Sequence, residues 1–208
     1  MYRAVIFDLG GVVFPSPFEA FDAYDADAGL APGTVRALVR ASSETGAWAA
    51  LERGELALPD FYARLESEAT AAEFRLDAAK LMATVASGFG PRPAMATAIR
   101  RIRDANLRTA ALTNNWPRLD DTEFPPTGNG LGFDVVIESA VVGLRKPDPR
   151  IYELVLSKLG VDAPDAVFLD DLGINLKPAR AMGMTTIKVS DPDVALAELA
   201  DVLGLEVH

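Results

Sequence analysis

The chain of 208 residues contains no cysteine and only one histidine. Without cysteine it can form no disulfide bond, no thiolate metal site and no thiol nucleophile. The one histidine, His208, ends the sequence, where we expect a solvated tail rather than a catalytic group. These absences direct attention to carboxylates, hydroxyls, amides and lysines as the carriers of any chemistry.

Long hydrophobic runs and an excess of positive charge are also missing. No apolar run approaches the ~18 residues of a membrane span, and Met1-Tyr2-Arg3 leads directly into strand-like residues, which leaves no room for a signal peptide. The formal net charge is −10, whereas a nucleic-acid-binding face has to be basic. We therefore expect a cytoplasmic monomer or homodimer that binds neither membranes nor nucleic acid.

The hydrophobic pattern predicts an α/β fold with a Rossmann-like, doubly wound parallel sheet, because strand-like runs alternate with helical periodicity. The expected strands are 3–8, 107–113, 133–138, 166–170 and 184–189, and the helices between and after them are 93–106, 149–159, 175–182 and 193–203.

An inserted helical segment interrupts this alternation. After the first strand, helical periodicity predominates as far as residue 87, and prolines and glycines divide the stretch into four or five short helices. We predict a core domain of residues 1–16 and 88–208, with residues 17–87 as an α-helical cap subdomain over the carboxyl ends of the strands.

The first strand ends in a carboxylate. The apolar run Ala4–Phe7 leads straight into Asp8, and Gly10 and Gly11 follow. Such a strand places Asp8 at the carboxyl edge of the sheet, where α/β proteins bind ligands. The glycines leave backbone amides free to face an anion.

Two later segments add donors and a positive charge. The apolar run that begins at Leu107 ends in Thr113 and Asn114, and a later loop carries Lys146 beside Pro147. A hydroxyl, an amide and an ammonium are the groups that neutralise the oxygens of a phosphoryl group.

A third segment ends in the acidic pair Asp170-Asp171. Neighbouring carboxylates that stay ionised repel each other unless a cation lies between them. Asp8 with Asp171 or Asp170 makes an all-oxygen site suited to Mg²⁺, which binds one or two carboxylates together with substrate phosphate. A carboxylate held in line with phosphorus is a nucleophile and forms an aspartyl phosphate. The groups expected around the phosphate are Thr113, Lys146 and the amides near Gly10, Gly11 and Asn114.

In their order and content these motifs resemble the haloacid dehalogenase-like (HAD) hydrolase superfamily, and above all the N-terminal phosphatase domain of soluble epoxide hydrolases. Similar domains begin some multi-domain acyl-CoA dehydrogenase-type proteins. The resemblance covers nearly the whole chain and is most specific between Leu112 and Val189. It rests on the segments Leu112–Trp116, Phe133–Ser139, Val142–Pro149 and Phe168–Arg180.

The resemblance implies a Mg²⁺-dependent phosphatase that acts on a small phosphorylated metabolite. It implies that Asp8 is the nucleophile and a metal ligand, that Asp171 is the direct metal carboxylate, and that Asp170 supports it. The further implied roles are metal ligation by the backbone carbonyl of Gly10, phosphate binding by Thr113 and Asn114, and stabilisation of both charges by Lys146. Asn175 either orients the metal carboxylates or caps the next helix, and we favour the first role.

One position departs from the family pattern. Active phosphatases of the superfamily usually carry a second Asp two residues after the nucleophile, where this chain has Gly10. Glycine can neither protonate a leaving alkoxide nor activate water, and such assistance is worth ~10²–10⁴-fold. The substitution therefore favours leaving groups that need little protonation, as in sugar 1-phosphates, acyl phosphates or aryl phosphates. Some sugar-phosphate phosphatases of the superfamily resemble this chain in having Gly there.

Two other function classes compete with the phosphatase. Gly10 also fits a catalytically weak phosphate-binding or regulatory domain. A response-regulator receiver fits less well, because its acidic pair follows the first strand and its Thr or Ser and its Lys come last. In this chain the acidic pair comes last. A dehalogenase, in which Asp attacks carbon without a metal, ranks last because the Asp170-Asp171 pair has no use in that chemistry.

Overall fold

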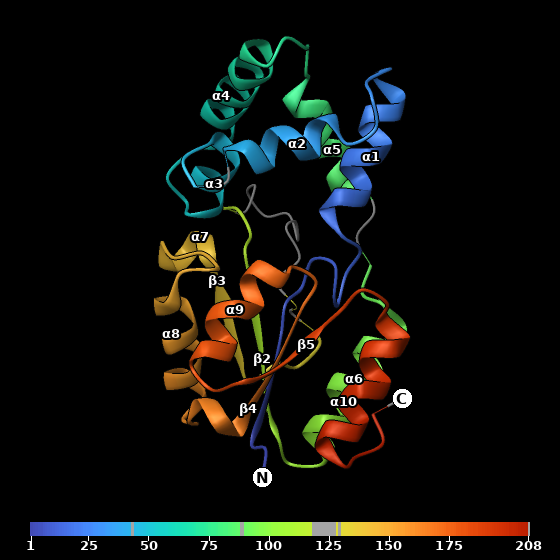
Figure 1. Ribbon diagram of the computed structural model, residues 1–208, viewed down its shortest axis with the longest axis vertical. Coiled ribbons are helices and arrows are strands. Elements are labelled where there is room, and N and C mark those ends of the chain that lie inside the picture. The colour runs from blue at the N-terminus through green and yellow to red at the C-terminus, as the bar shows by residue number, and fades with distance from the viewer. Residues whose placement is uncertain (43, 88–89, 118–127, 129, 208) are drawn as a thin grey trace.

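The computed structural model describes residues 1–208 except 43, 88–89, 118–127, 129 and 208. The expectation for His208 thus lies outside the described residues. In this described part of the chain, five parallel strands form one sheet in the order β3-β2-β1-β4-β5, with helices on both faces (Figure 1). The strands are β1 (Ala4–Phe7), β2 (Arg108–Thr113), β3 (Val135–Glu138), β4 (Ala166–Asp170) and β5 (Thr185–Lys188). The predicted α/β fold class is confirmed.

The helices that flank the sheet leave the strands buried on both sides. They are α6 (Pro93–Asp104), α8 (Pro149–Leu159), α9 (Gly173–Ala181) and α10 (Pro192–Leu203). Val5 and Phe7 of β1 pack in a cluster with α6 and α10, whereas Ala4 and Ile6 pack with α8 and α9. Because both faces are covered, the central strands read as unbroken hydrophobic runs rather than as alternating patterns.

Two details of the core differ from the sequence-based expectation. Helix α9 begins at Gly173, not at residue 175, because Leu172 donates its amide to Asp170 Oδ1 at 2.8 Å and the chain turns directly after β4. The four-residue helix α7 (Ser139–Val142) was not predicted. Its two valines favour a strand, and one turn is too short to show helical periodicity.

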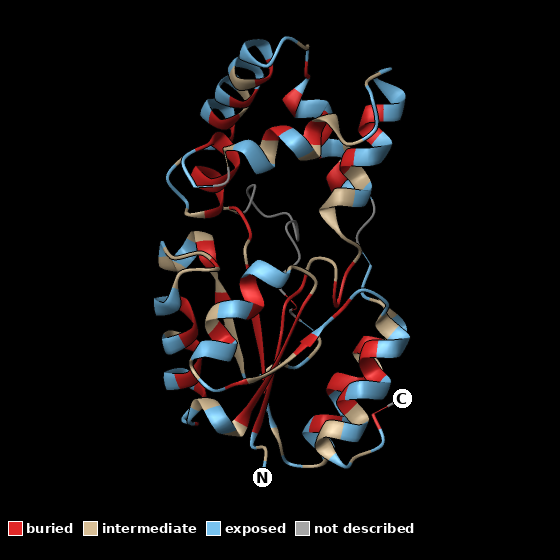
Figure 2. Cartoon of the chain, viewed as in Figure 1, coloured by how far each residue is buried: buried red, intermediate tan, exposed pale blue. Residues whose placement is uncertain are grey.

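The described residues of the inserted segment form five helices, within the predicted four or five. They are α1 (Pro17–Asp27), α2 (Thr34–Ala41), α3 (Ala47–Glu52), α4 (Leu58–Ala71) and α5 (Ala78–Ser87). They surround an apolar cluster of their own in which Trp48 contacts Phe21 and Phe61 edge-on, with ring centroids 5.0 and 5.8 Å apart. Figure 2 shows buried residues along the inner sides of these helices and, separately, along the sheet.

The five inserted helices lie beyond the carboxyl ends of the strands (Figure 1). The division into a core and a cap at residues 17 and 87 stays a prediction. Within the described ranges, none of the helices has the length and apolar character needed to cross a membrane.

Candidate active site

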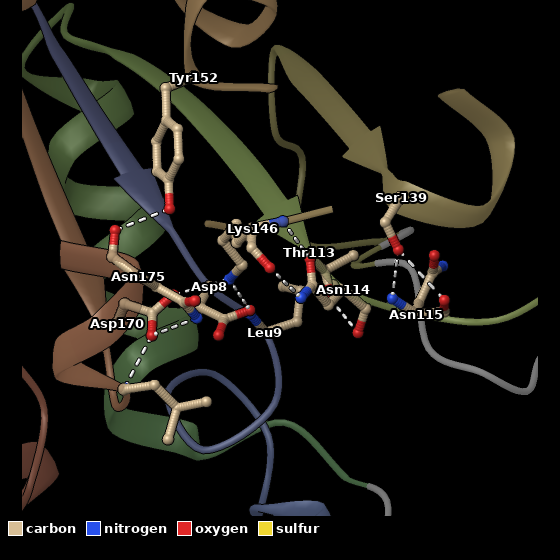
Figure 3. Close-up of polar contacts among 11 residues, drawn as sticks. Asp8, Leu9, Thr113, Asn114, Asn115, Ser139, Lys146, Tyr152, Asp170 and Asn175 are labelled. Carbon is tan, nitrogen blue, oxygen red and sulfur yellow. Dashed lines mark hydrogen bonds and ion pairs between the residues drawn. The ribbon is translucent and has the colours of Figure 1, made fainter. Parts of the chain in front are cut away.

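Strand ends bring the predicted site residues together at one edge of the sheet (Figure 3). Asp8 directly follows β1, Thr113 is the last residue of β2, and Asp170 is the last residue of β4. Because β1 pairs with both β2 and β4, Asp8 occupies the centre of this edge. Thr113 is buried, and its Oγ1 makes one long contact, 3.5 Å, to the carbonyl of Asn114.

Lys146 reaches this edge from a loop and is fully buried. Its Nζ lies 2.8 Å from Asp8 Oδ1 and 2.7 Å from Asp170 Oδ2. Its backbone is held by the side chain of Asn114, which accepts from the Lys146 amide at 2.8 Å and donates to the Lys146 carbonyl at 3.0 Å. A cis peptide bond follows at Pro147. The ammonium is therefore fixed between two carboxylates. The Asn114 side chain holds the backbone of the loop that carries Lys146.

The charges of the site shift the pKa values of its groups. Burial, reinforced by Asp170 and Asp171, raises the pKa of Asp8 well above its usual range, although Lys146 opposes this. Burial works against the charged form of Lys146, but Asp170 and Asp8 outweigh it and raise the pKa of Lys146. Burial and the charge of Asp170 raise the pKa of Asp171 to about 6.

The three carboxylates form a cluster suited to a cation. Oxygens of Asp8, Asp170 and Asp171 lie within 4.8 Å of one another, and Lys146 is the one cation that contacts them in the described part of the chain. With all three ionised, the cluster carries two negative charges in excess of the lysine. Such crowding in a buried place favours a second cation, and an all-oxygen donor set is the kind that Mg²⁺ prefers.

The two acidic residues at the end of β4 are engaged differently. Both oxygens of Asp170 are occupied, because Oδ1 accepts from Leu172 and Asn175 and Oδ2 accepts from Lys146 and Asn175. Asp171 receives no hydrogen bond from another described side chain. Asp171 and Asp8 thus have carboxylate oxygens left for a metal, whereas both oxygens of Asp170 are already engaged within the protein.

The two glycines after Asp8 differ in what they allow. Gly11 has a left-handed backbone, φ 79°, and a Cβ built on it would overlap the Asp171 carboxylate. Its amide donates to the carbonyl of Pro15 at 3.3 Å. Gly10 has no such backbone restriction, and a Cβ there would meet only Pro17 Cδ, at 3.3 Å. Gly11 therefore makes room for Asp171, whereas position 10 faces the start of α1.

Asn175 donates hydrogen bonds to Asp170 and itself accepts one from Tyr152. Its Nδ2 lies 3.0 and 3.1 Å from the two oxygens of Asp170, and its carbonyl accepts from the hydroxyl of Tyr152 at 2.7 Å. Tyr152 is fully buried, and burial raises the pKa of its phenol far above the usual range. No sequence pattern pointed to Tyr152, because a tyrosine on the inner face of a helix has the pattern of ordinary core packing.

Asn115 was also missed as a structural element of the site. Its amide donates to Ser139 Oγ at 2.9 Å, its Nδ2 donates to Glu138 Oε2 at 2.7 Å, and its Oδ1 accepts from Ala140 at 3.4 Å. The next residue, Trp116, packs in the cluster of the inserted helices. The segment after β2 thus ties the site both to α7 and to the insert.

Comparison with known proteins gives a consistent set of relatives. A family model described as haloacid dehalogenase-like hydrolase matches residues 2–183. The mouse protein acyl-CoA dehydrogenase family member 10 is 39% identical over 211 residues, which cover 100% of this chain and 20% of that protein. Bifunctional epoxide hydrolase 2 of Sus scrofa is 32% identical, with 99% of this chain and 39% of that protein covered. The chain thus spans well under half the length of these two relatives.

A third relative has about the length of this chain. Sesquiterpene phosphatase astK of Aspergillus oryzae is 28% identical over 98% of this chain and 97% of its own. Among solved structures, a HAD family enzyme of Bacteroides thetaiotaomicron in complex with magnesium and inorganic phosphate is similar with a TM-score of 0.63. The two share 18% identity, with 90% of this chain and 94% of that chain covered, so this likeness shows the fold.

Proposed function

Because the chain belongs to the haloacid dehalogenase-like hydrolase family, we propose that it is a Mg²⁺-dependent phosphatase. The membership confirms the resemblance seen in the sequence. The chain is a hydrolase of this family, and one relative of similar length is named a phosphatase. The observation that supports the phosphatase best is the buried Lys146, 2.8 Å from Asp8 and 2.7 Å from Asp170, beside a third carboxylate on Asp171. The substrate class that we propose is a small phosphorylated metabolite.

The donor set of the cluster fits a magnesium ion. Asp8, Asp171 and the carbonyl of Gly10 would hold it, with Asp170 in support, because Asp170 already satisfies both of its oxygens within the protein. When bound, Mg²⁺ supplies positive charge against the phosphate and the carboxylates. Magnesium and phosphate in the Bacteroides enzyme of the same fold support the proposal.

The chain's own residues would carry the reaction in two displacements. An Asp8 oxygen attacks phosphorus, the new O–P bond forms an aspartyl phosphate, and the leaving oxygen departs with the electrons of its bond to phosphorus. Water then attacks the same phosphorus, the Asp8 O–P bond breaks with its electrons returning to Asp8, and inorganic phosphate leaves. One proton of the water passes to solvent, and the leaving oxygen takes a proton from solvent. Lys146 and the Thr113 hydroxyl offset the charge on the phosphoryl oxygens. Lys146 Nζ already lies within 2.8 Å of Asp8 and Asp170, so the lysine side chain needs little movement before the reaction.

Chelation is expected to abolish hydrolysis, and added Mg²⁺ to restore it. Asp8 and Asp171 bring negative charge close to an incoming phosphate, and without a cation the repulsion would block attack. A panel of sugar, acyl, aryl and alkyl phosphates, assayed with Mg²⁺ and with EDTA, measures this directly.

Two further measurements on the same protein select the competing functions. Haloacids assayed after exhaustive chelation test the dehalogenase, and release of halide at full rate would establish that function instead. Phosphate binding without turnover of any compound would establish the binding or regulatory domain.

Replacement of Lys146 tests the role of its ammonium group in the reaction. We expect Lys146→Met to lower kcat/KM more than Lys146→Arg, with both variants impaired. A compact ammonium fits between Asp8 and Asp170 at 2.8 and 2.7 Å, whereas a guanidinium is larger and directs its donors differently. Steady-state kinetics with the best substrate of the panel measure the order. Wild-type kinetics in a folded Lys146→Met variant would remove this residue from the reaction.

A further inference from the structure

A largely buried ion pair joins the inserted helices to the loop of Lys146. Arg145 Nε and Nη2 lie 2.8 and 2.6 Å from Glu52 Oε2. The other oxygen, Glu52 Oε1, accepts from Trp48 Nε1 at 3.0 Å. The side chains of Arg145 and Glu52 are 20% and 10% exposed. Glu52 ends α3 and Arg145 immediately precedes Lys146, so the pair connects two segments that are far apart in the sequence.

Glu52 is anchored firmly on the side of the insert. Trp48, which donates to it, lies in the apolar cluster of the inserted helices and contacts Phe21, Phe61 and Trp116. A carboxylate that is buried and held by an indole cannot follow a displaced arginine without disturbing that cluster. Breaking a buried pair also leaves an uncompensated charge, unlike the loss of an exposed pair, which has little effect.

A second contact lies beside the ion pair. Gly54, which follows α3, has φ 70°, and a Cβ built on it would overlap the carbonyl oxygen of Ala140 in α7. Helix α7 is in turn held by Asn115, which bonds to Glu138, Ser139 and Ala140. The end of α3 therefore packs against two segments that border the site, the loop of Lys146 and helix α7.

We propose that Glu52 and Arg145 are positioning residues for Lys146, a role that rests on the proposed phosphatase function. Asn114, Asp8 and Asp170 hold the lysine from the core, and the Glu52–Arg145 pair holds the preceding residue from the insert. The loop is thereby fixed from two sides, and the ammonium stays within hydrogen-bond distance of the nucleophile. Since a misplacement of about 1 Å in a reacting group can cost ~10²-fold in rate, a partial loss of this fixation is measurable.

The test is Arg145→Gln, compared with Arg145→Lys, Glu52→Gln and the double variant Glu52→Gln/Arg145→Gln. We expect Arg145→Gln to lower kcat about 10-fold with KM changed less than about twofold, because Lys146 acts on the reacting charges. Arg145→Lys retains the charge and should lose less. The double variant should be no worse than the poorer single variant, as for two residues that act as one unit. The matched control is Arg150→Gln, which removes an exposed ion pair with Asp148 close to the same loop and should leave kinetics unchanged.

Crystal structures of the wild type and Arg145→Gln give a second readout, the distances from Lys146 Nζ to Asp8 and Asp170. We expect at least one of them to lengthen beyond hydrogen-bond range in the variant. Unchanged lysine contacts, or a higher KM at unchanged kcat, would overturn the positioning role. If Arg145→Gln does not fold, Arg145→Lys is judged by the same two readouts. If the wild type hydrolyses no phosphate, the proposed function fails, and the lysine distances alone decide this inference.

Discussion

Asp8→Asn is expected to reduce phosphate release by about 10³-fold or more, because it removes the proposed nucleophile. The amide is nearly isosteric with the carboxylate, but it attacks phosphorus poorly and is a weaker ligand for a hard cation. The amide oxygen of the variant side chain can still accept from the Leu9 amide and from Lys146, which Asp8 Oδ1 contacts at 2.7 and 2.8 Å. Lys146 also keeps Asp170. The variant should therefore fold as the wild type does.

The stability of this variant gives an independent check. Burial and the neighbouring carboxylates raise the pKa of Asp8 in the folded protein, so ionised Asp8 opposes folding near neutral pH in the absence of metal. A neutral amide removes this opposition but also one of the two carboxylates that raise the pKa of Lys146, so the Tm of the metal-free variant should stay close to that of the wild type. The stabilisation by Mg²⁺ should shrink, since one ligand is lost.

Asp104→Asn is the matched control for Asp8→Asn. Asp104 is the last residue of α6 and is exposed, and it precedes by four residues the start of β2 at Arg108, whereas the site lies at the carboxyl ends of the strands. Its variant should keep wild-type rates. If Asp8→Asn is folded and retains more than a few per cent of the wild-type rate, Asp8 is not the nucleophile.

The sequence predicts the centre of the site because parallel strands all end at the same edge of the sheet. Asp8, Thr113 and Asp170 each stand at the end of an apolar run, and the carboxyl ends of parallel strands meet at one edge of the sheet. Two such positions on strands that pair with β1 must be close to Asp8. Lys146 lies on a loop, and its place beside Asp8 followed from the family resemblance rather than from periodicity.

The surroundings of the site could not be predicted in the same way. Tyr152, Asn115 and the Glu52–Arg145 pair act through contacts between segments 23 to 93 residues apart. No local pattern marks such contacts, because each side chain has an ordinary interpretation in its own helix or loop. The distinction between Asp170 and Asp171 came from the family resemblance, because no local pattern separates two adjacent carboxylates. In the structure it depends on which carboxylate Lys146 and Asn175 reach.

Hydrolysis rates should depend steeply on the pKa of the leaving group, because Gly10 occupies the position where the family resemblance implies an acid in active phosphatases. We expect aryl, acyl and anomeric phosphates to be hydrolysed faster than simple alkyl phosphates, by an amount on the order of the ~10²–10⁴-fold that general acid catalysis supplies. A plot of log(kcat/KM) against leaving-group pKa for the wild type measures the slope. A flat plot would show that another group, from the insert or from the substrate, provides the proton.

Gly10→Asp should flatten that dependence by returning a carboxyl group to position 10. The backbone permits the substitution, because Gly10 lacks the left-handed φ of Gly11, and the new Cβ would meet Pro17 Cδ at 3.3 Å, so that Pro17 must shift by a few tenths of an ångström. Gly10→Ala adds the same Cβ without an acid and so separates the contact with Pro17 from the chemistry. If Gly10→Asp accelerates alkyl phosphates while Gly10→Ala does not, the missing acid limits the wild type. Equal slopes in all three proteins would mean that protonation of the leaving group does not limit the reaction, and the argument from Gly10 would be wrong.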